Sequence, residues 1–450
     1  MELFAETVLT SQGWLENVSL TVADGRVTAL TANSKASPEA EHHAILVPAI
    51  ANLHSHAFQR AMAGRTERSG ASSDSFWTWR EEMYRFALTM SPDEVEAVAT
   101  LLYVEMLEAG FCRVGEFHYL HHAPDGSPYD NLAEMAERIA AAAASSGIGL
   151  TLLPVFYAHS SFGGAAPVAN QRRFINGLDR FEKLLNQSAQ TLNQLVNTNI
   201  GIAPHSLRAV TPEELVALTA MGANRPFHIH ISEQLKEVED SVKWSALRPV
   251  EWLLTNAEVR PNWCLIHATH MTKWESQGIA KSGAVVGLCP ITESNLGDGI
   301  FEGERFMSQG GVFGVGSDSN VQIGLADELR QLEYSQRLGF KSRNVLAQPK
   351  GSTGRALFEG ALKGGHQALG IGQGGIAAGH QADFISLDNK QSALFEMSGD
   401  HILDAWIFSG QRCVDCVWVA GKKLVTNGRH HLRDAATKRY KQAMKKLVSQ

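Results

Sequence analysis

Residues 47–59 read Val-Pro-Ala-Ile-Ala-Asn-Leu-His-Ser-His-Ala-Phe-Gln, an apolar run that leads into two histidines separated by one residue. Side chains at positions i and i+2 of a β-strand lie on the same face of the sheet. His54 and His56 are therefore predicted to point the same way at the end of a mostly buried strand. Two imidazoles at this spacing can hold one divalent metal, although an isolated pair can equally be a surface feature. The rest of the chain has to supply the missing ligands.

Apolar segments alternate with amphipathic helical segments from residue 47 to about residue 340. The segments predicted to be strands are 47–56, 112–119, 148–158, 199–205, 226–231, 263–268, 284–289 and 312–316. Eight strands that alternate with helices predict an α/β fold closed as a (β/α)8 TIM barrel. An open, doubly wound sheet is the alternative, but its first strand should be followed by a glycine-rich phosphate turn. His-Ser-His stands at that place instead.

The two ends of the chain have a different pattern. Residues 1–46 contain short alternating strands with a turn at Asp24-Gly25, and short strands return beyond residue 375. The simplest arrangement pairs these two segments with each other. We therefore predict a small flanking β-sandwich domain built from residues 1–46 and 376–450, beside a barrel of residues 47–375.

Composition restricts the partners and the compartment. A net charge of −7 argues against a nucleic-acid-binding surface, because phosphate binding needs a basic face. The acidic start Met1-Glu-Leu-Phe-Ala-Glu is unlike a secretory signal, and the weakly polar stretch 139–158 is interpreted as a helix end followed by a strand, not a membrane span. Five cysteines fit a reducing cytoplasm better than a disulfide framework. We expect a cytoplasmic homodimer without nucleic-acid or membrane partners.

Polar residues follow the predicted strands at the end where a barrel carries its active site. Three imidazoles and one carboxylate form a nitrogen and oxygen site that suits zinc or another first-row divalent ion. His228 shares the strand face of His230 and is its main rival as a ligand. The end of the fourth strand, 202–206, has no lysine or acid that could bridge two ions, so one metal is predicted. The ligands that we assign are His54, His56, His230 and Asp318.

The order of these ligands on a (β/α)8 barrel resembles the amidohydrolase superfamily over nearly the whole chain. The closer signatures are Asn-Leu-His-Ser-His-Ala-Phe-Gln-Arg-Ala-Met-Ala-Gly at 52–64, Glu-Phe-His-Tyr-Leu-His-His at 116–122, Ala-Pro-His-Ser-Leu-Arg-Ala at 203–209 and His-Ile-His-Ile-Ser-Glu-Gln at 228–234. Together they resemble the N-formimino-L-glutamate deiminases of histidine degradation. The resemblance implies one zinc on the four ligands, and catalytic roles for Glu233, His267 and Asp318. It implies substrate-binding roles for Gln59, Tyr119, His205 and Arg208.

The chemistry of that reaction agrees with these residue types. Hydrolysis of a formimino group needs a hydroxide at neutral pH, and bound zinc lowers the pKa of water to about 7. Ammonia leaves only when its nitrogen is protonated, so a general acid is needed, and Glu233 suits that role. Asp318 can accept the proton of the water, and His267 can orient the hydroxide. Glutamate brings two carboxylates, which an arginine fork and neutral donors can bind. The donors expected for them are Arg208, Gln59 and Tyr119.

Two other functions stay open at this point. A related deaminase acting on a purine, guanidine or triazine ring should have a pocket richer in apolar and aromatic contacts. A non-catalytic barrel used as a scaffold should have lost ligands, whereas all four candidates are present. The motif Cys413-Val-Asp-Cys416 has no second cysteine or histidine pair near it, so a metal or redox role is not favoured. Phe76-Trp-Thr-Trp-Arg80 is typical of helix packing, with a lid or a subunit contact as the alternative.

Overall fold

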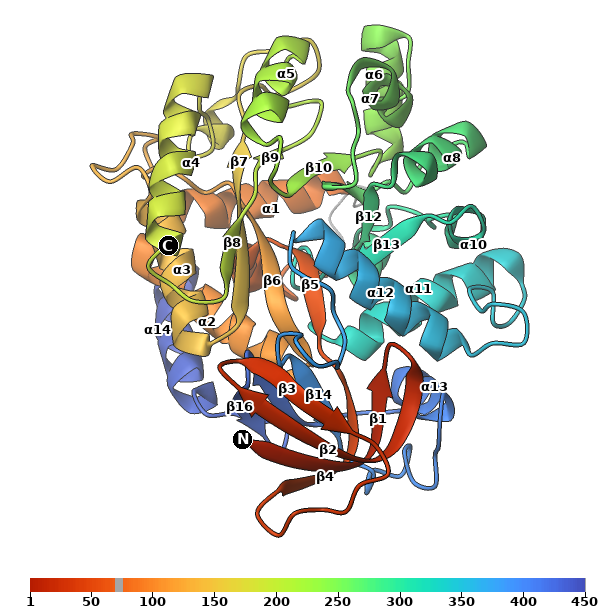
Figure 1. Ribbon diagram of the computed structural model, residues 1–450. Coiled ribbons are helices and arrows are strands. Elements are labelled where there is room, and N and C mark those ends of the chain that lie inside the picture. Colours follow the sequence, from red (N-terminus) through yellow and green to blue (C-terminus); the bar gives the residue numbers. More distant parts are fainter. Residues whose placement is uncertain (69–75, 450) are drawn as a thin grey trace.

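The structure is a computed structural model that describes residues 1–68 and 76–449. Figure 1 shows a large part in which strands are surrounded by helices, and a smaller part made mainly of strands. The red strands from the start of the chain and the blue strands from its last part lie together in the smaller part, whereas the final helix runs along the side of the larger part (Figure 1). The predicted combination of a parallel α/β barrel with a separate sheet from both chain ends is therefore confirmed.

The barrel is built from one five-stranded and one four-stranded sheet, and neighbouring strands within each are parallel. The short strands β8 and β9 together take the fourth position around the barrel. These strands are almost entirely buried, as expected where helices cover a parallel sheet. They are β5 (Ile50–Ser55), β6 (Phe111–His118), β7 (Gly149–Phe156), β8 (Thr198–Ile200), β9 (Ala203–Pro204), β10 (Phe227–Ile231), β11 (Trp263–His267), β12 (Val285–Leu288) and β13 (Val312–Val315).

Two seams join these sheets into a closed barrel, and both seams lie at candidate ligands. At one seam the backbone N–H of His56 donates to the Asp318 carbonyl at 2.9 Å, and the Asp318 N–H donates to the His54 carbonyl at 3.0 Å. At the other seam the His230 N–H donates to the His205 carbonyl at 3.0 Å. Barrel closure itself therefore places the end of the first strand beside that of the eighth, and the end of the fourth strand beside that of the fifth.

Helices cover the outside of the barrel. Several begin with the residues that the sequence predicts, because Ser91 and Thr211 each form a capping box with the glutamate three residues on. Helix α12 approaches β13 closely through Gly364, where an added Cβ would lie 1.8 Å from the Phe313 carbonyl oxygen. The helices are α2 (Pro92–Glu108), α3 (Glu134–Ser146), α4 (Leu178–Leu192), α5 (Pro212–Met221), α6 (Leu235–Ser245), α7 (Pro249–Asn256), α8 (Lys273–Ser282), α9 (Pro290–Leu296), α10 (Gly303–Ser308), α11 (Leu325–Phe340) and α12 (Thr353–Ala368).

The smaller part is one sheet in the order β17-β16-β15-β14-β4-β1-β2-β3. Strand β4 joins the two chain ends, because it pairs with β1 in parallel and with β14 in antiparallel fashion. The sheet has its own cluster of buried apolar side chains, which includes Val18, Leu46 and Trp418. The strands are β1 (Glu2–Thr10), β2 (Gly13–Ala23), β3 (Arg26–Thr31), β4 (Glu41–Pro48), β14 (Phe384–Leu387), β15 (Val414–Val419), β16 (Lys422–Thr426) and β17 (Arg429–His430).

The chain beyond residue 375 differs from its prediction as strands alone. It also forms α13 (His401–Phe408) and α14 (Arg433–Ser449). Helix α14 buries Ala436, Ala443 and Leu447, which follow a helical period and pack toward α2, but many lysines between them hide this pattern. The domain bounds 1–46, 47–375 and 376–450 stay a prediction. No helix of residues 1–68 and 76–449 is long and apolar enough to cross a membrane.

Candidate active site

The four predicted metal ligands converge at the carboxyl ends of the barrel strands. His56 donates its Nδ1–H to the Phe117 carbonyl at 2.9 Å, and His230 donates its Nδ1–H to the His205 carbonyl at 3.0 Å. Each ring is thereby fixed with its Nε2 lone pair directed inward. His54 Nε2 lies 3.1 Å from His230 Nε2, and Asp318 Oδ1 lies 3.3 Å from His54 Nε2. His56 Nε2 is 3.2 Å from the same oxygen.

The protonation states of this group suit a divalent cation. Burial lowers the pKa of His54 to about 3 and holds that of His230 well below its usual value, so both rings are neutral at pH 7. Burial alone would raise the pKa of Asp318, but its close interactions with His54 and His56 hold it well below its usual range. Inward lone pairs of neutral imidazoles beside a carboxylate have no donor to satisfy them within the group. The donor set therefore fits a first-row ion such as zinc.

The rival ligand His228 lies elsewhere. It is fully buried, and its Nε2 donates to the Ala368 carbonyl at the end of α12 at 2.8 Å. Burial lowers its pKa to about 4. His228 thus ties β10 to α12, and it is absent from the cluster that contains His230.

A buried hydrogen-bond network positions Asp318, and the sequence pattern did not reveal it. Asn52 donates to Ser317 Oγ at 2.7 Å, and Ser317 Oγ donates to Asn320 Oδ1 at 2.6 Å. The Asn320 amide then donates to the carbonyls of His56 and Asp318, each at 2.9 Å. Asp318 itself has a positive φ of 44°, a conformation that costs energy and is held here by these bonds.

Glu233 and His267 face the same centre. Ser232 has a φ of 50°, so the chain turns sharply after β10 and brings Glu233 Oε1 to 3.8 Å from His267 Nε2. His267 Nδ1 lies 3.3 Å from Glu293 Oε1, a buried carboxylate on α9 that the sequence pattern did not identify. Although burial opposes the charged ring, Glu233, Glu293 and Asp318 raise the pKa of His267 to about 10. Burial raises the pKa of Glu233, so this carboxyl group holds a proton more readily than usual.

The predicted substrate-binding residues line one pocket beside this centre. Gln59 Nε2 donates to the Tyr119 hydroxyl at 2.9 Å, and both side chains are buried. His205 and Arg208 come from the loop after β9, and Arg208 Nε has no hydrogen-bond partner among the described residues. The unfilled space is about 50 Å³. It is lined by His56, Gln59, Phe76, Trp79, Arg80, Met83, Tyr119, His205, Arg208, His230, Glu233, His267, Leu296 and Asp318.

The aromatic segment that begins at Phe76 belongs to this pocket. It forms the start of α1 (Phe76–Thr89), which lies across the barrel (Figure 1) and places Trp79, Arg80 and Met83 against the pocket. The sequence alone did not single out Arg80 as a functional residue. Its guanidinium donates to the Tyr157 hydroxyl at 3.2 Å and lies 5.2 Å from the Tyr84 ring. Within residues 1–68 and 76–449, neither Arg80 nor Arg208 forms an ion pair with a carboxylate.

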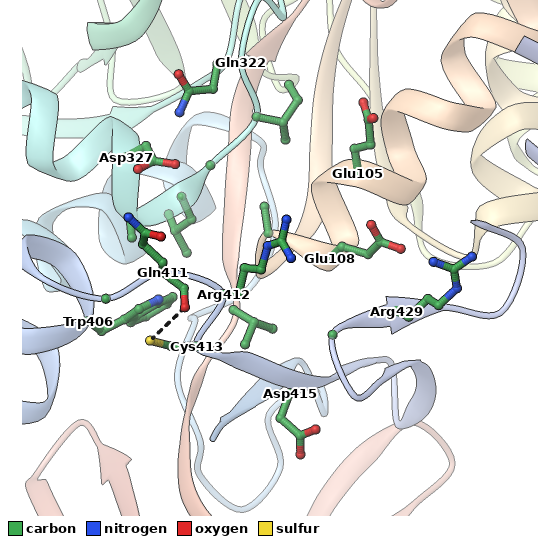
Figure 2. Close-up of a pocket in the computed structure, with 18 of the residues that line it drawn as sticks. Glu105, Glu108, Gln322, Asp327, Trp406, Gln411, Arg412, Cys413, Asp415 and Arg429 are labelled. Carbon is green, nitrogen blue, oxygen red and sulfur yellow. Dashed lines mark hydrogen bonds between the residues drawn. The ribbon is translucent and has the colours of Figure 1, made fainter. Parts of the chain in front are cut away.

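The larger cavity of about 1200 Å³ lies away from the catalytic centre. Figure 2 shows it between residues of the barrel helices, such as Glu105 and Asp327, and residues of the smaller part, such as Arg412 and Cys413. None of the four metal ligands lines it. We therefore place the chemistry in the smaller pocket, where the titratable groups converge.

Comparison with known proteins identifies the class that this barrel and its ligand set define. Residues 45–424 match the family model of the amidohydrolase family, and residues 2–44 match the model described as formimidoylglutamate deiminase HutF, N-terminal domain. The chain belongs to the amidohydrolase family. Within that family it is 45% identical to formimidoylglutamate deiminase of Pseudomonas aeruginosa, over 99% of both chains.

Solved structures agree with this assignment. An amidohydrolase from Brucella melitensis is 56% identical, covers 99% of both chains and superposes with a TM-score of 0.97. An adenosine deaminase from Xanthomonas campestris with bound zinc is 21% identical and superposes with a TM-score of 0.83, covering 100% of this chain and 98% of its own. The second likeness shows the shared fold alone.

Proposed function

We propose that this protein hydrolyses N-formimino-L-glutamate to N-formyl-L-glutamate and ammonia, the deimination step of histidine degradation. The observation that carries the proposal is the pocket, where two arginines without a carboxylate partner among residues 1–68 and 76–449 lie beside a cluster of metal-ligating and proton-carrying groups. A substrate with one amidine and two carboxylates matches this arrangement. The 45% identical relative named for the same reaction supports it over nearly the full length.

The catalytic centre is proposed to hold one zinc ion on His54, His56, His230 and Asp318. A divalent ion bound there supplies an acidified water, and hence a hydroxide equivalent at neutral pH. The backbone carbonyls of Phe117 and His205 keep two of the imidazoles in the ligating tautomer.

Acidic and basic side chains of the protein carry out the proton transfers. Water adds to the amidine carbon, and the bond from that carbon to the terminal nitrogen then breaks. Asp318 is ionised and can accept the proton that water loses. Glu233 can deliver a proton to the nitrogen that leaves as ammonia. His267, held cationic by Glu293 and its other acidic neighbours, stabilises negative charge that develops on the attacking oxygen.

Recognition of the two carboxylates is assigned to two cations that line the pocket, and both lie near the Trp77 ring. Arg208 follows β9, whereas Arg80 comes from α1. Each guanidinium can form a bidentate contact, and each is free of a competing carboxylate among the described residues. Gln59 and Tyr119 add neutral hydrogen-bonding groups, since Gln59 Oε1 has no partner in the part of the chain that the structure describes. A purine or triazine ring would leave both arginines without a matching anion, and this disfavours the alternative deaminases. A homodimer in the cytoplasm remains a proposal.

Ammonia release from N-formimino-L-glutamate tests the proposed function. We expect turnover of this compound and at most trace turnover of guanine, adenosine and a triazine under the same conditions. Formation of N-formyl-L-glutamate in equal amount to ammonia, measured by mass spectrometry, distinguishes deimination from complete loss of the formimino group. A preference for any of the ring substrates would contradict the proposal.

Metal analysis tests the catalytic ligand set. Protein purified without chelators is expected to carry one zinc per chain, and His230→Gln should lose it together with activity, because one of three imidazole ligands is removed. The matched control is His228→Gln, two residues away on the same strand but bonded to Ala368. It should keep the metal. Loss of metal from the His228 variant with retention in the His230 variant would reverse the assignment.

A further inference from the structure

A second group of metal-ligating side chains lies in the smaller part of the molecule, far in sequence from the catalytic ligands. Glu41 and His43 come from β4, and Cys416 comes from β15. One ligand atom of each lies within 4.8 Å of the other two. The closest pair is His43 Nε2 and Glu41 Oε1, which are 3.0 Å apart. The mechanism proposed above uses none of these residues.

Burial distinguishes this group from an ordinary surface cluster. The His43 side chain is 6% exposed, and Cys416 is buried in the apolar cluster of the sheet. The His43 ring packs edge-on against Trp418, with ring centroids 5.0 Å apart. Glu41 is 37% exposed, so the group opens to solvent on one side. An ion could enter there and meet donors that are already held in place.

Charge and ligand type are those of a transition-metal site. Asp415 Oδ2 lies 3.4 Å from Cys416 Sγ, but Asp415 lines the large cavity and does not belong to the converging group. Lys423 forms an ion pair with Glu41. A divalent ion bound by the Cys416 thiolate and the Glu41 carboxylate would be electrically neutral once it has displaced the Lys423 ammonium. Sulfur, imidazole and carboxylate donors together favour zinc or cobalt over magnesium or calcium.

We propose that Glu41, His43 and Cys416, with water from the open side as fourth ligand, form a structural site for a zinc-like divalent ion. The site would link β4 to β15 and so fasten the N-terminal and C-terminal segments of the small sheet to each other. It should be weaker than the catalytic site, because an incoming ion must displace the Cys416 proton and the Lys423 ammonium. Purified protein therefore carries its catalytic metal, and this second site fills when more metal is added.

The neighbouring cysteine provides a matched control. Cys413 is also buried, but it lines the large cavity, where Figure 2 shows it next to Gln411. Its side chain belongs to a different apolar cluster from that of Cys416. The C-x-x-C motif is therefore not a single ligand pair, and replacing Cys413 should leave the proposed site intact.

The experiment is titration of the zinc-loaded enzyme with Co²⁺, followed by removal of free ion and metal analysis. Wild type and Cys413→Ser are expected to take up a second equivalent and to gain a near-ultraviolet thiolate-to-cobalt charge-transfer absorption. Cys416→Ser and His43→Gln should lose both signals, and they should retain the catalytic zinc and ammonia release. If Cys416→Ser does not fold, His43→Gln alone still tests the proposed site.

Two outcomes would overturn the second site. One is a wild-type protein that takes up no further cobalt at saturation. The other is a charge-transfer absorption that persists in Cys416→Ser, since this would locate the thiolate at another cysteine, such as Cys289 beside Glu293. Failure of the deiminase assay would leave these measurements unaffected, because neither depends on the substrate.

Discussion

Glu233→Gln is expected to keep the catalytic metal and lose most turnover. The side chain lies 3.8 Å from His267 and is not one of the four converging ligands, so its proposed role is to carry a proton. Glutamine preserves the shape and the hydrogen-bonding capacity but cannot exchange a proton. Removal of general acid–base catalysis typically costs about 10²–10⁴-fold in rate. Steady-state ammonia release and metal content of the same preparation are the two measurements.

A control variant distinguishes proton transfer by Glu233 from a role in holding the loop after β10 in place. Glu237 accepts a hydrogen bond from the Glu233 backbone N–H at 3.1 Å but does not line the pocket. Glu237→Gln should therefore reduce turnover much less than Glu233→Gln. If Glu233→Gln loses its zinc, the residue is a ligand, and if it retains near wild-type turnover, the proton takes another route.

Arg208→Met is expected to reduce kcat/KM for the natural substrate and leave the metal in place. Truncating one partner of a buried charge pair costs about 2–5 kcal/mol, or roughly thirtyfold to several thousandfold, largely because the other charge loses its partner. Methionine keeps much of the apolar part of the arginine side chain but lacks the guanidinium that binds a carboxylate. The measurement is kinetics with N-formimino-L-glutamate and with N-formimino-4-aminobutyrate, which lacks the α-carboxylate. The loss should be much smaller with the second compound.

The matched variant is Arg80→Met, at the other arginine that lines the pocket. If the two arginines hold different carboxylates, this variant should be most harmful with the natural substrate and least harmful with N-formimino-2-aminobutyrate, which lacks the side-chain carboxylate. A crossed pattern of two variants and two analogues assigns each guanidinium to one end of the substrate. An equal loss for Arg208→Met on both compounds would mean that Arg208 supports the fold or the metal centre instead.

Much of the barrel follows from local sequence signals. Apolar strand segments, the capping box at Thr211 and the H-x-H pair are local patterns with a fixed period or spacing, so a single stretch of chain reveals them. Boundaries were less well predicted. The apolar stretch from Val47 spans the end of β4 and the start of β5, which belong to different sheets, and periodicity carries no information about which sheet a strand joins.

In the site too, some residues could be predicted from the local sequence, whereas others depend on the tertiary structure. The sequence alone proposed His54, His56 and Asp318, because each follows a strand at the catalytic end of the barrel. It also assigned His230, with His228 on the same strand face as its rival, and the structure removes that rival because His228 bonds to the Ala368 carbonyl on α12. The sequence could not reveal Arg80, Glu293 or the group around Cys416. Those side chains reach their neighbours by packing of distant elements, and such contacts leave no period or spacing in the sequence.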